Sequence, residues 1–129
     1  MKVDRRKGIL LIESFSKADK DIVFDGSIVA GFNCRFRKLV AKEIIVGKGC
    51  VVRYAKAEKI VLGASSVFGV LDCEDAILMN NCIGKLLVAK SAKIADNCKI
   101  YEIKAHFLEI SGSSKVEKVF VEKLRLQKF

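Results

Sequence analysis

This 129-residue chain has five cysteines and one histidine, two residue types that bind metals, and a cysteine can also form a disulfide or act as a nucleophile. No two cysteines form a Cys-x-x-Cys pair, and a tetrahedral zinc site needs ligands that converge on one point. No acid, base and nucleophile recur at a fixed spacing around His106, and no glycine-rich phosphate loop precedes a helix. The sequence therefore predicts no catalytic, cofactor or metal site and no small-molecule substrate, and an enzyme is the function that it supports least.

Four of the cysteines are separated by multiples of sixteen residues, which indicates that they share one structural position. Ser66 and Ser114 continue the series at the same spacing. A position that accepts Cys and Ser requires a small, nearly apolar side chain, as expected of buried free cysteines. Stacked neighbours would lie about 5 Å apart at Cα, which a disulfide tolerates, so their oxidation stays an open alternative. The stacked pairs are Cys34 with Cys50 and Cys82 with Cys98.

The same interval governs most of the chain. Residues 41–56 and 57–72 match in kind at nearly every position, and the pattern extends without an insertion from residue 25 to residue 120. Such self-similarity is typical of repeat architectures. Small or apolar residues recur at the first, fourth, sixth, tenth, twelfth and fifteenth positions of the block, with Gly84 as the exception at the twelfth. The fourth position, for example, is filled by Ile28, Ile44, Ile60, Ala76, Ala92, Leu108 and Leu124.

The spacing within a block predicts short strands and corners. These positions follow one another at intervals of 3, 2, 4, 2, 3 and 2 residues, a mixture that never settles at the helical period. Three pairs of residues two apart describe one three-sided coil with three short strands. The predicted fold is an all-β, single-stranded parallel β-helix, or β-solenoid, with a triangular core, about 16 residues per coil and six to seven coils. Corner residues are expected to adopt left-handed backbone angles, and these are Gly47, Gly63, Asn33, Asn81 and Asn97.

The N-terminal residues lie largely outside the repeat, which divides the chain into an N-terminal segment, 1–21, and a β-helix domain, 22–129. A weakly matching block over residues 9–24 has Ile12 and Ala18 at apolar positions of the repeat. A short apolar run in this segment is expected to form a strand that caps the first coil or, as the alternative, a small membrane-touching anchor. The run consists of Ile9, Leu10, Leu11 and Ile12.

The N-terminus lacks the features of a secretory signal. Its basic start is followed by only four apolar residues before Glu13, too few for the apolar region of a signal peptide. No run approaches the roughly 18 apolar residues that a membrane-spanning helix requires. The sequence therefore predicts a cytoplasmic protein, membrane-associated if the apolar run is an anchor.

The charge balance bears on partners. Lys and Arg number 24 against 15 Asp and Glu, a net charge of +9. This excess favours contact with a membrane surface or an acidic protein partner, and a lysine-rich solvated surface is the alternative. Sequence-specific nucleic-acid binding is disfavoured because no element suited to reading a groove is present. Non-specific contact with nucleic acid would involve Arg35, Arg37, Lys38, Arg53 and Lys56.

Three outward positions of the middle coils are apolar where a solvated surface would be polar: the fifth, the eleventh and the fourteenth, the last filled by Tyr54, Val70 and Leu86. Exposed apolar stripes mark lateral association or lipid contact. A local shift of the strand face, or a cover formed by the N-terminal segment, is the alternative. The possible lateral interface comprises Ile45, Val61 and Ile77 at the fifth position and Val51, Val67 and Ile83 at the eleventh.

The two ends of such a rod are the most reactive part of the predicted fold. An uncapped β-helix presents a coil of unpaired N–H and C=O groups that another molecule can continue. The sequence after Val119 has no proline and no helical pattern that would cap the last coil. End-to-end association of copies is therefore expected.

The opening of the repeat, Asp21-Ile22-Val23-Phe24-Asp25-Gly26-Ser27-Ile28, and blocks such as Ala41 to Gly47 and Ala57 to Gly63 resemble the bactofilins. The resemblance covers roughly residues 21–126. It implies a right-handed β-helix that polymerises without nucleotide into non-polar cytoskeletal filaments through contacts between like ends, often with a membrane-binding N-terminal tail and recruited client proteins. By position, it places the end contacts at Ile22, Val23, Phe24 and Ile28 and at Phe120, Leu124, Leu126 and Phe129.

A binding module is the second hypothesis. A short β-helix that resembles the C-terminal domain of bacterial division-site inhibitors would use a flat face to bind a partner protein or a dimer mate. The stripe of Ile45, Val61 and Ile77 fits this function equally well. Size under dilution separates the hypotheses, because a polymer sediments and an adaptor stays a dimer.

Overall fold

The computed structural model describes residues 1–127 and contains thirteen strands in a single sheet, without a helix in this range. The strands in the first half are β1 (Lys2–Asp4), β2 (Ile9–Ile12), β3 (Lys17–Val23), β4 (Ser27–Ala30), β5 (Arg35–Val40), β6 (Glu43–Val46) and β7 (Val51–Lys56). Those in the second half are β8 (Lys59–Leu62), β9 (Val67–Asp72), β10 (Asp75–Leu78), β11 (Ile83–Ile94), β12 (Lys99–Ser111) and β13 (Lys115–Gln127).

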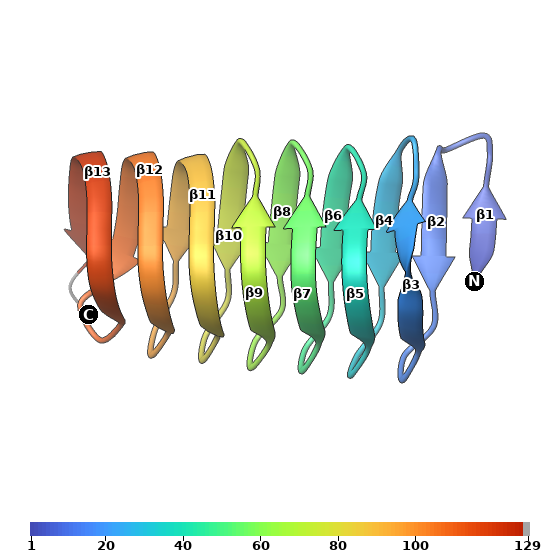
Figure 1. The fold of residues 1–129 in the computed structure, drawn as a ribbon, viewed down its shortest axis with the longest axis horizontal. Coiled ribbons are helices and arrows are strands. Elements are labelled where there is room, and N and C mark those ends of the chain that lie inside the picture. The colour runs from blue at the N-terminus through green and yellow to red at the C-terminus, as the bar shows by residue number, and fades with distance from the viewer. Residues whose placement is uncertain (128–129) are drawn as a thin grey trace.

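The chain winds into a rod of about seven stacked coils, as the repeat predicts (Figure 1). From β4 onward each strand pairs in parallel with the strand one coil away, so that Ile44 lies beside Ile60 and Val52 beside Phe68. The nearer strands in Figure 1 run upward and the farther strands downward while the chain advances to the left, which makes the coil right-handed. The fold is the predicted β-solenoid.

The middle coils contain two separate strands each, and the expected third strand is continuous with the second. Val52 and Ala55 both face inward although they are three residues apart, because β7 bends between them. From β11 onward the next corner, at Ala89, is also extended, so that one strand covers the whole turn. The three sides remain, and one of the three corners is extended in the middle coils and two from β11 onward.

The core is a set of residue columns that run along the axis, and the predicted inward positions form it. Ile28, Ile44 and Ile60 follow one another in one column, and Leu39, Ala55 and Leu71 follow one another in a second. All six side chains are buried. Because every column repeats similar side chains about 4.8 Å apart, the interior is continuous from one coil to the next.

Two kinds of corner residue meet different needs. Asn33, Asn81 and Asn97 have φ values of 54°, 64° and 58°, in the left-handed region as predicted. The same prediction is wrong for Gly47 and Gly63, which do not have a positive φ. A Cβ on Gly63 would lie 2.4 Å from the backbone of Gly47, so this column of glycines allows close approach of neighbouring coils.

The first coil is part of the rod and is longer than the others. Leu10 pairs with Ile28, eighteen residues later, whereas Ile22 pairs with Leu39, seventeen residues later. A bulge between Ala18 and Asp21 absorbs the difference. The weak block over residues 9–24 is therefore out of register, and β3 continues across the expected domain boundary at residue 21.

Candidate interaction surfaces at the ends and sides of the rod

The C-terminal rim of the rod is an open end of the hydrophobic core. β13 pairs with β12 along one edge, and its other edge pairs with no described strand. Leu124 continues the column of Leu108, and Leu126 continues that of Ile110. Leu108 and Ile110 are 1% and 5% exposed, whereas Leu124 and Leu126 are 53% and 61% exposed. The last coil therefore presents core residues that lack the cover that every earlier coil receives.

The predicted C-terminal contact residues fall into three groups. Leu124 and Leu126 lie in core columns at the rim. Phe120 pairs with Lys104 at an outward position and is exposed on the flank of the strand. Phe129 lies outside the described residues. Val119 was not among the predicted contacts, yet it continues the column of Ile103 and is exposed, and its fifteenth position in the block was the signal for it.

The N-terminal rim differs because part of it is covered. β1 pairs antiparallel with β2, with Val3 beside Leu10. Leu10 and Ile12 are only 6% and 3% exposed at this end. β3 pairs only with β5, so its outer edge is open within the described chain. The two ends of the rod are therefore unlike each other.

The predicted N-terminal contacts require a correction. Ile28 is 0% exposed and lies beside Leu10, so the first coil covers it and it is not a residue of the rim. Ile22 and Phe24 are half-buried and pack against the core, and Val23 is exposed. These three residues remain at the open β3 side of this end.

The prediction that the apolar run, residues 9–12, could contact a membrane also requires a correction. Leu10 and Ile12 are buried in the first coil and cannot contact a bilayer in this fold. Ile9 is half-buried, and Leu11 is exposed on the outward side of β2. No helix in the described range is long and apolar enough to cross a membrane.

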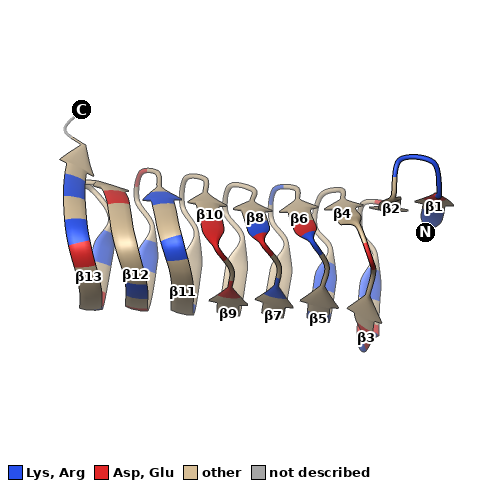
Figure 2. Cartoon of the chain, turned by 90° about the horizontal axis from the view of Figure 1, so that it is seen from above, with Lys and Arg blue, Asp and Glu red and all other residues tan. Residues whose placement is uncertain are grey.

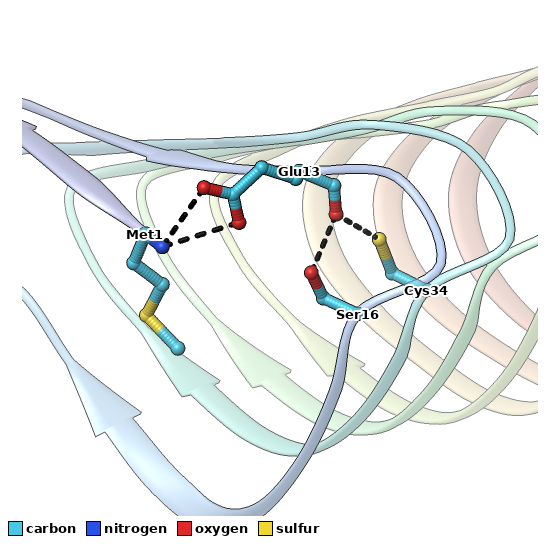
Figure 3. Close-up of polar contacts among 4 residues, drawn as sticks. All are labelled: Met1, Glu13, Ser16 and Cys34. Carbon is cyan, nitrogen blue, oxygen red and sulfur yellow. Dashed lines mark hydrogen bonds and ion pairs between the residues drawn. The ribbon is translucent and has the colours of Figure 1, made fainter.

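Glu13 ties the N-terminal cap to the first corner (Figure 3). Its carboxylate oxygens accept hydrogen bonds from the Met1 amino group at 3.0 and 3.1 Å. Its backbone oxygen accepts from Ser16 Oγ at 2.6 Å and from Cys34 Sγ at 3.2 Å. A hydrogen bond from its own backbone amide and the contact with the amino group lower the pKa of the Glu13 carboxyl. One residue thus holds the chain start and the beginning of the cysteine column.

The Cys and Ser column forms a hydrogen-bonded ladder at one corner. Cys50 Sγ donates to the Gly31 oxygen at 3.3 Å and accepts from the Cys34 amide at 3.4 Å. Ser66 Oγ donates to the Gly47 oxygen at 3.3 Å and accepts from the Cys50 amide at 3.1 Å. The Cys or Ser side chain at this corner therefore pairs a backbone amide and a backbone carbonyl oxygen of neighbouring coils. The sequence indicated only that the side chain is small, not that it forms these hydrogen bonds.

The thiols of this ladder are structural. All five cysteines are free and buried. Burial raises the pKa of Cys50 and raises that of Cys73 to about 12. A thiol hydrogen bond with Cys98 raises the pKa of Cys82 and lowers that of Cys98. No group of three or more Cys, His, Asp or Glu in residues 1–127 is placed to hold a metal ion.

The two apolar stripes lie on different sides of the rod. Ile45, Val61 and Ile77 are half-buried on the outer side of β6, β8 and β10. Val51, Val67 and Ile83 follow one another on β7, β9 and β11. Val67 and Ile83 are 41% and 51% exposed, so this second stripe is the more accessible one. The structure thus provides two side surfaces in addition to the two ends.

Comparison of the chain with protein-family models, with curated proteins and with solved structures found no match.

Proposed function

We propose that this chain is a structural protein that assembles end to end, without nucleotide, into filaments that can carry partner proteins. The observation that supports this function best is the C-terminal rim, where the free edge of β13 and the exposed Leu124 and Leu126 lie together. An unpaired strand edge offers backbone hydrogen bonds, and an open core column offers apolar contact. A second copy supplies both.

The contact that satisfies this rim joins like ends. In a twofold contact between two C-terminal rims, each copy offers the same patch and Leu126 faces apolar residues of its partner. A filament then needs a second contact at the N-terminal ends, where Ile22, Val23 and Phe24 surround the open edge of β3. Since β1 covers part of that end, the C-terminal contact is expected to be the tighter of the two. Such non-polar assembly is also what the resemblance to bactofilins implies.

Sedimentation and negative-stain microscopy of the purified full chain test this proposal. The wild type is expected to form concentration-dependent rods longer than one molecule. Leu126→Arg is expected to reduce these to single molecules or pairs, because a buried unpaired charge at the contact is costly. Lys123→Glu is the matched control, since Lys123 faces outward on the same strand beside Phe107. Far-UV circular dichroism verifies that each variant keeps its strands.

Two outcomes contradict end-to-end assembly. A wild type that stays monomeric at every concentration excludes it, and so does a Leu126→Arg variant that forms rods of the same length. A small particle whose size does not change on dilution and that binds a different protein supports the second candidate function, an adaptor that binds a partner through one flat face. The observation that favours this candidate is the accessible stripe of Val51, Val67 and Ile83.

A further inference from the structure

The accessible stripe belongs to a longer outward column with an ordered charge pattern. Two cations, three apolar residues and two further cations follow one another along the rod, each in register with the next. At about 4.8 Å per coil the column is roughly 30 Å long. Its members are Lys17, Arg35, Val51, Val67, Ile83, Lys99 and Lys115.

The N-terminal half of this column opens into a hollow of about 520 Å³. Lys17, Arg35, Arg37 and Arg53 line it, and Asp19 is the one acidic residue in its lining. Arg37 lies 3.8 Å from an oxygen of Asp21, whereas Lys17, Arg35 and Arg53 form no ion pair with another described residue. Three cations around one hollow are thus available to an anionic group from outside.

The opposite side of the rod does not share this excess. Glu43, Lys59 and Asp75 alternate in register across β6, β8 and β10 (Figure 2). At the corner that leads into these strands, Lys42 lies 3.6 Å from Asp25, and Lys90 lies 3.4 Å from Glu74. Cations and carboxylates neutralise each other there. The unbalanced positive charge is therefore a property of the side formed by β3, β5 and β7.

We propose that this column, from Lys17 to Lys115, binds a segment of a partner protein in which apolar side chains are flanked on both sides by Asp or Glu. The acidic residues of the segment pair with the cations at each end of the column, and its apolar side chains contact Val67 and Ile83. An extended segment of about nine residues spans the 30 Å. A second copy of this chain does not fit, because its own corresponding face is cationic.

Side-chain length separates a protein segment from a bilayer. On one flat sheet face, Lys and Arg extend farther from the backbone than Val and Ile. A bilayer would meet the cations first and leave the apolar stripe short of the acyl chains, whereas the side chains of a protein segment can reach down between the cations. Nucleic acid is disfavoured because, within this column, three apolar residues separate the two pairs of cations, so the column does not offer a continuous row of charges to a phosphate backbone.

Fluorescence anisotropy with defined probes tests the proposal. The first probe is a fluorescein-labelled peptide of Glu-Glu-Glu, Leu-Ser-Leu-Ser-Leu and Glu-Glu-Glu. Two control peptides replace every Leu by Ser, or every Glu by Lys. The first probe is expected to bind at least tenfold more tightly than either control. Arg35→Glu and Ile83→Ser are each expected to weaken it at least tenfold, and Lys59→Glu on the opposite side is the matched control that leaves binding unchanged.

Several results would overturn the proposal. Equal binding of the three peptides would show that the order of acidic and apolar residues is not recognised. A Lys59→Glu variant that binds as weakly as Arg35→Glu would show that the peptide does not bind at this column. Phosphatidylglycerol vesicles or a single-stranded oligonucleotide that bind more tightly than the first peptide replace the protein partner by lipid or nucleic acid. The proposal develops the adaptor function and is independent of the end contacts. Leu126→Arg is therefore expected to bind the peptide as the wild type does.

Discussion

The ring of Phe68 occupies the space that a side chain at Gly84 would need. The two residues are neighbours in one core column, on β9 and β11. A Cβ on Gly84 would lie 2.0 Å from Phe68 Cζ, closer than any real contact. Gly84, the exception in the apolar columns of the sequence, therefore makes room for the large ring of Phe68, and the two residues together fill the volume of two ordinary core side chains.

This pair makes a reciprocal prediction about stability. Gly84→Ala is expected to lower the free energy of unfolding by about 1–3 kcal/mol, because the added methyl group overpacks the core against the ring. Phe68→Leu is also expected to lower the free energy of unfolding, because the smaller side chain leaves a cavity where the ring was. Urea denaturation of both single variants and of the double variant measures the coupling between them.

In the double variant, leucine frees space for the new methyl group, so its loss is expected to be smaller than the sum of the single losses by about 1 kcal/mol or more. Val52→Ala, in the same column one coil away, is the control for a simple cavity and is not expected to offset Gly84→Ala. Additive losses in the Phe68 double variant would show that ring and glycine do not compete for the same space.

The hydrogen-bonded ladder of Cys and Ser predicts which side chains position 66 can accept. Ser66→Ala removes a donor to the Gly47 oxygen and an acceptor from the Cys50 amide. Leaving these buried groups unpaired is expected to cost about 1–3 kcal/mol. Ser66→Cys, which matches the neighbouring coils, is expected to cost clearly less. Thermal unfolding of the two variants checks this order, and an alanine as stable as the cysteine would rule out the ladder as a stabilising element.

The buried thiols are expected to resist modification. In the native protein the five cysteines should show no rapid reaction with a thiol-specific disulfide reagent, and all five should react once guanidinium unfolds the chain. A raised pKa of Cys73, about 12, works in the same direction as its burial, whereas the pKa of Cys98 is lowered by its hydrogen bond with Cys82, so burial alone protects that thiol. The absorbance of the released chromophore counts the thiols. Rapid reaction of even one native thiol would mean that the corner opens.

The cap at Glu13 is expected to loosen in acid. Because its folded pKa is lowered from the usual 4.5, its contact contributes stability above the pKa of the unfolded chain and loses it as pH falls through the folded value. Amide hydrogen exchange in β1 and β2, corrected for intrinsic rates, is expected to increase relative to the middle coils between pH 6 and pH 3. Glu13→Gln should exchange faster at pH 6 and change less with pH. An equal pH response in both proteins would assign the effect to another acid.

The amino-acid sequence alone determined the coil length, the inward columns and the solenoid fold. In a parallel coil, residue i lies beside residue i+16, so each structural position becomes a chemical column that is visible in the sequence. Ile28, Ile44 and Ile60 illustrate this, as do Cys34 and Cys50. The same logic placed Leu124 and Leu126 in core columns, whereas their selection as end contacts came from the resemblance.

Features without a period were decided only by the tertiary structure. The bulge at Ala18, which sets the register of the first coil, and the antiparallel cover of β1 over β2 depend on contacts that occur once. For this reason the prediction of Ile28 as an end contact is wrong, and so is the alternative of a membrane contact at Leu10. The space left at Gly84 by Phe68, and the cations left unpaired on one side, likewise follow from which neighbours meet in three dimensions. Periodic stacking can be inferred from spacing, whereas single contacts become visible only when the chain is folded.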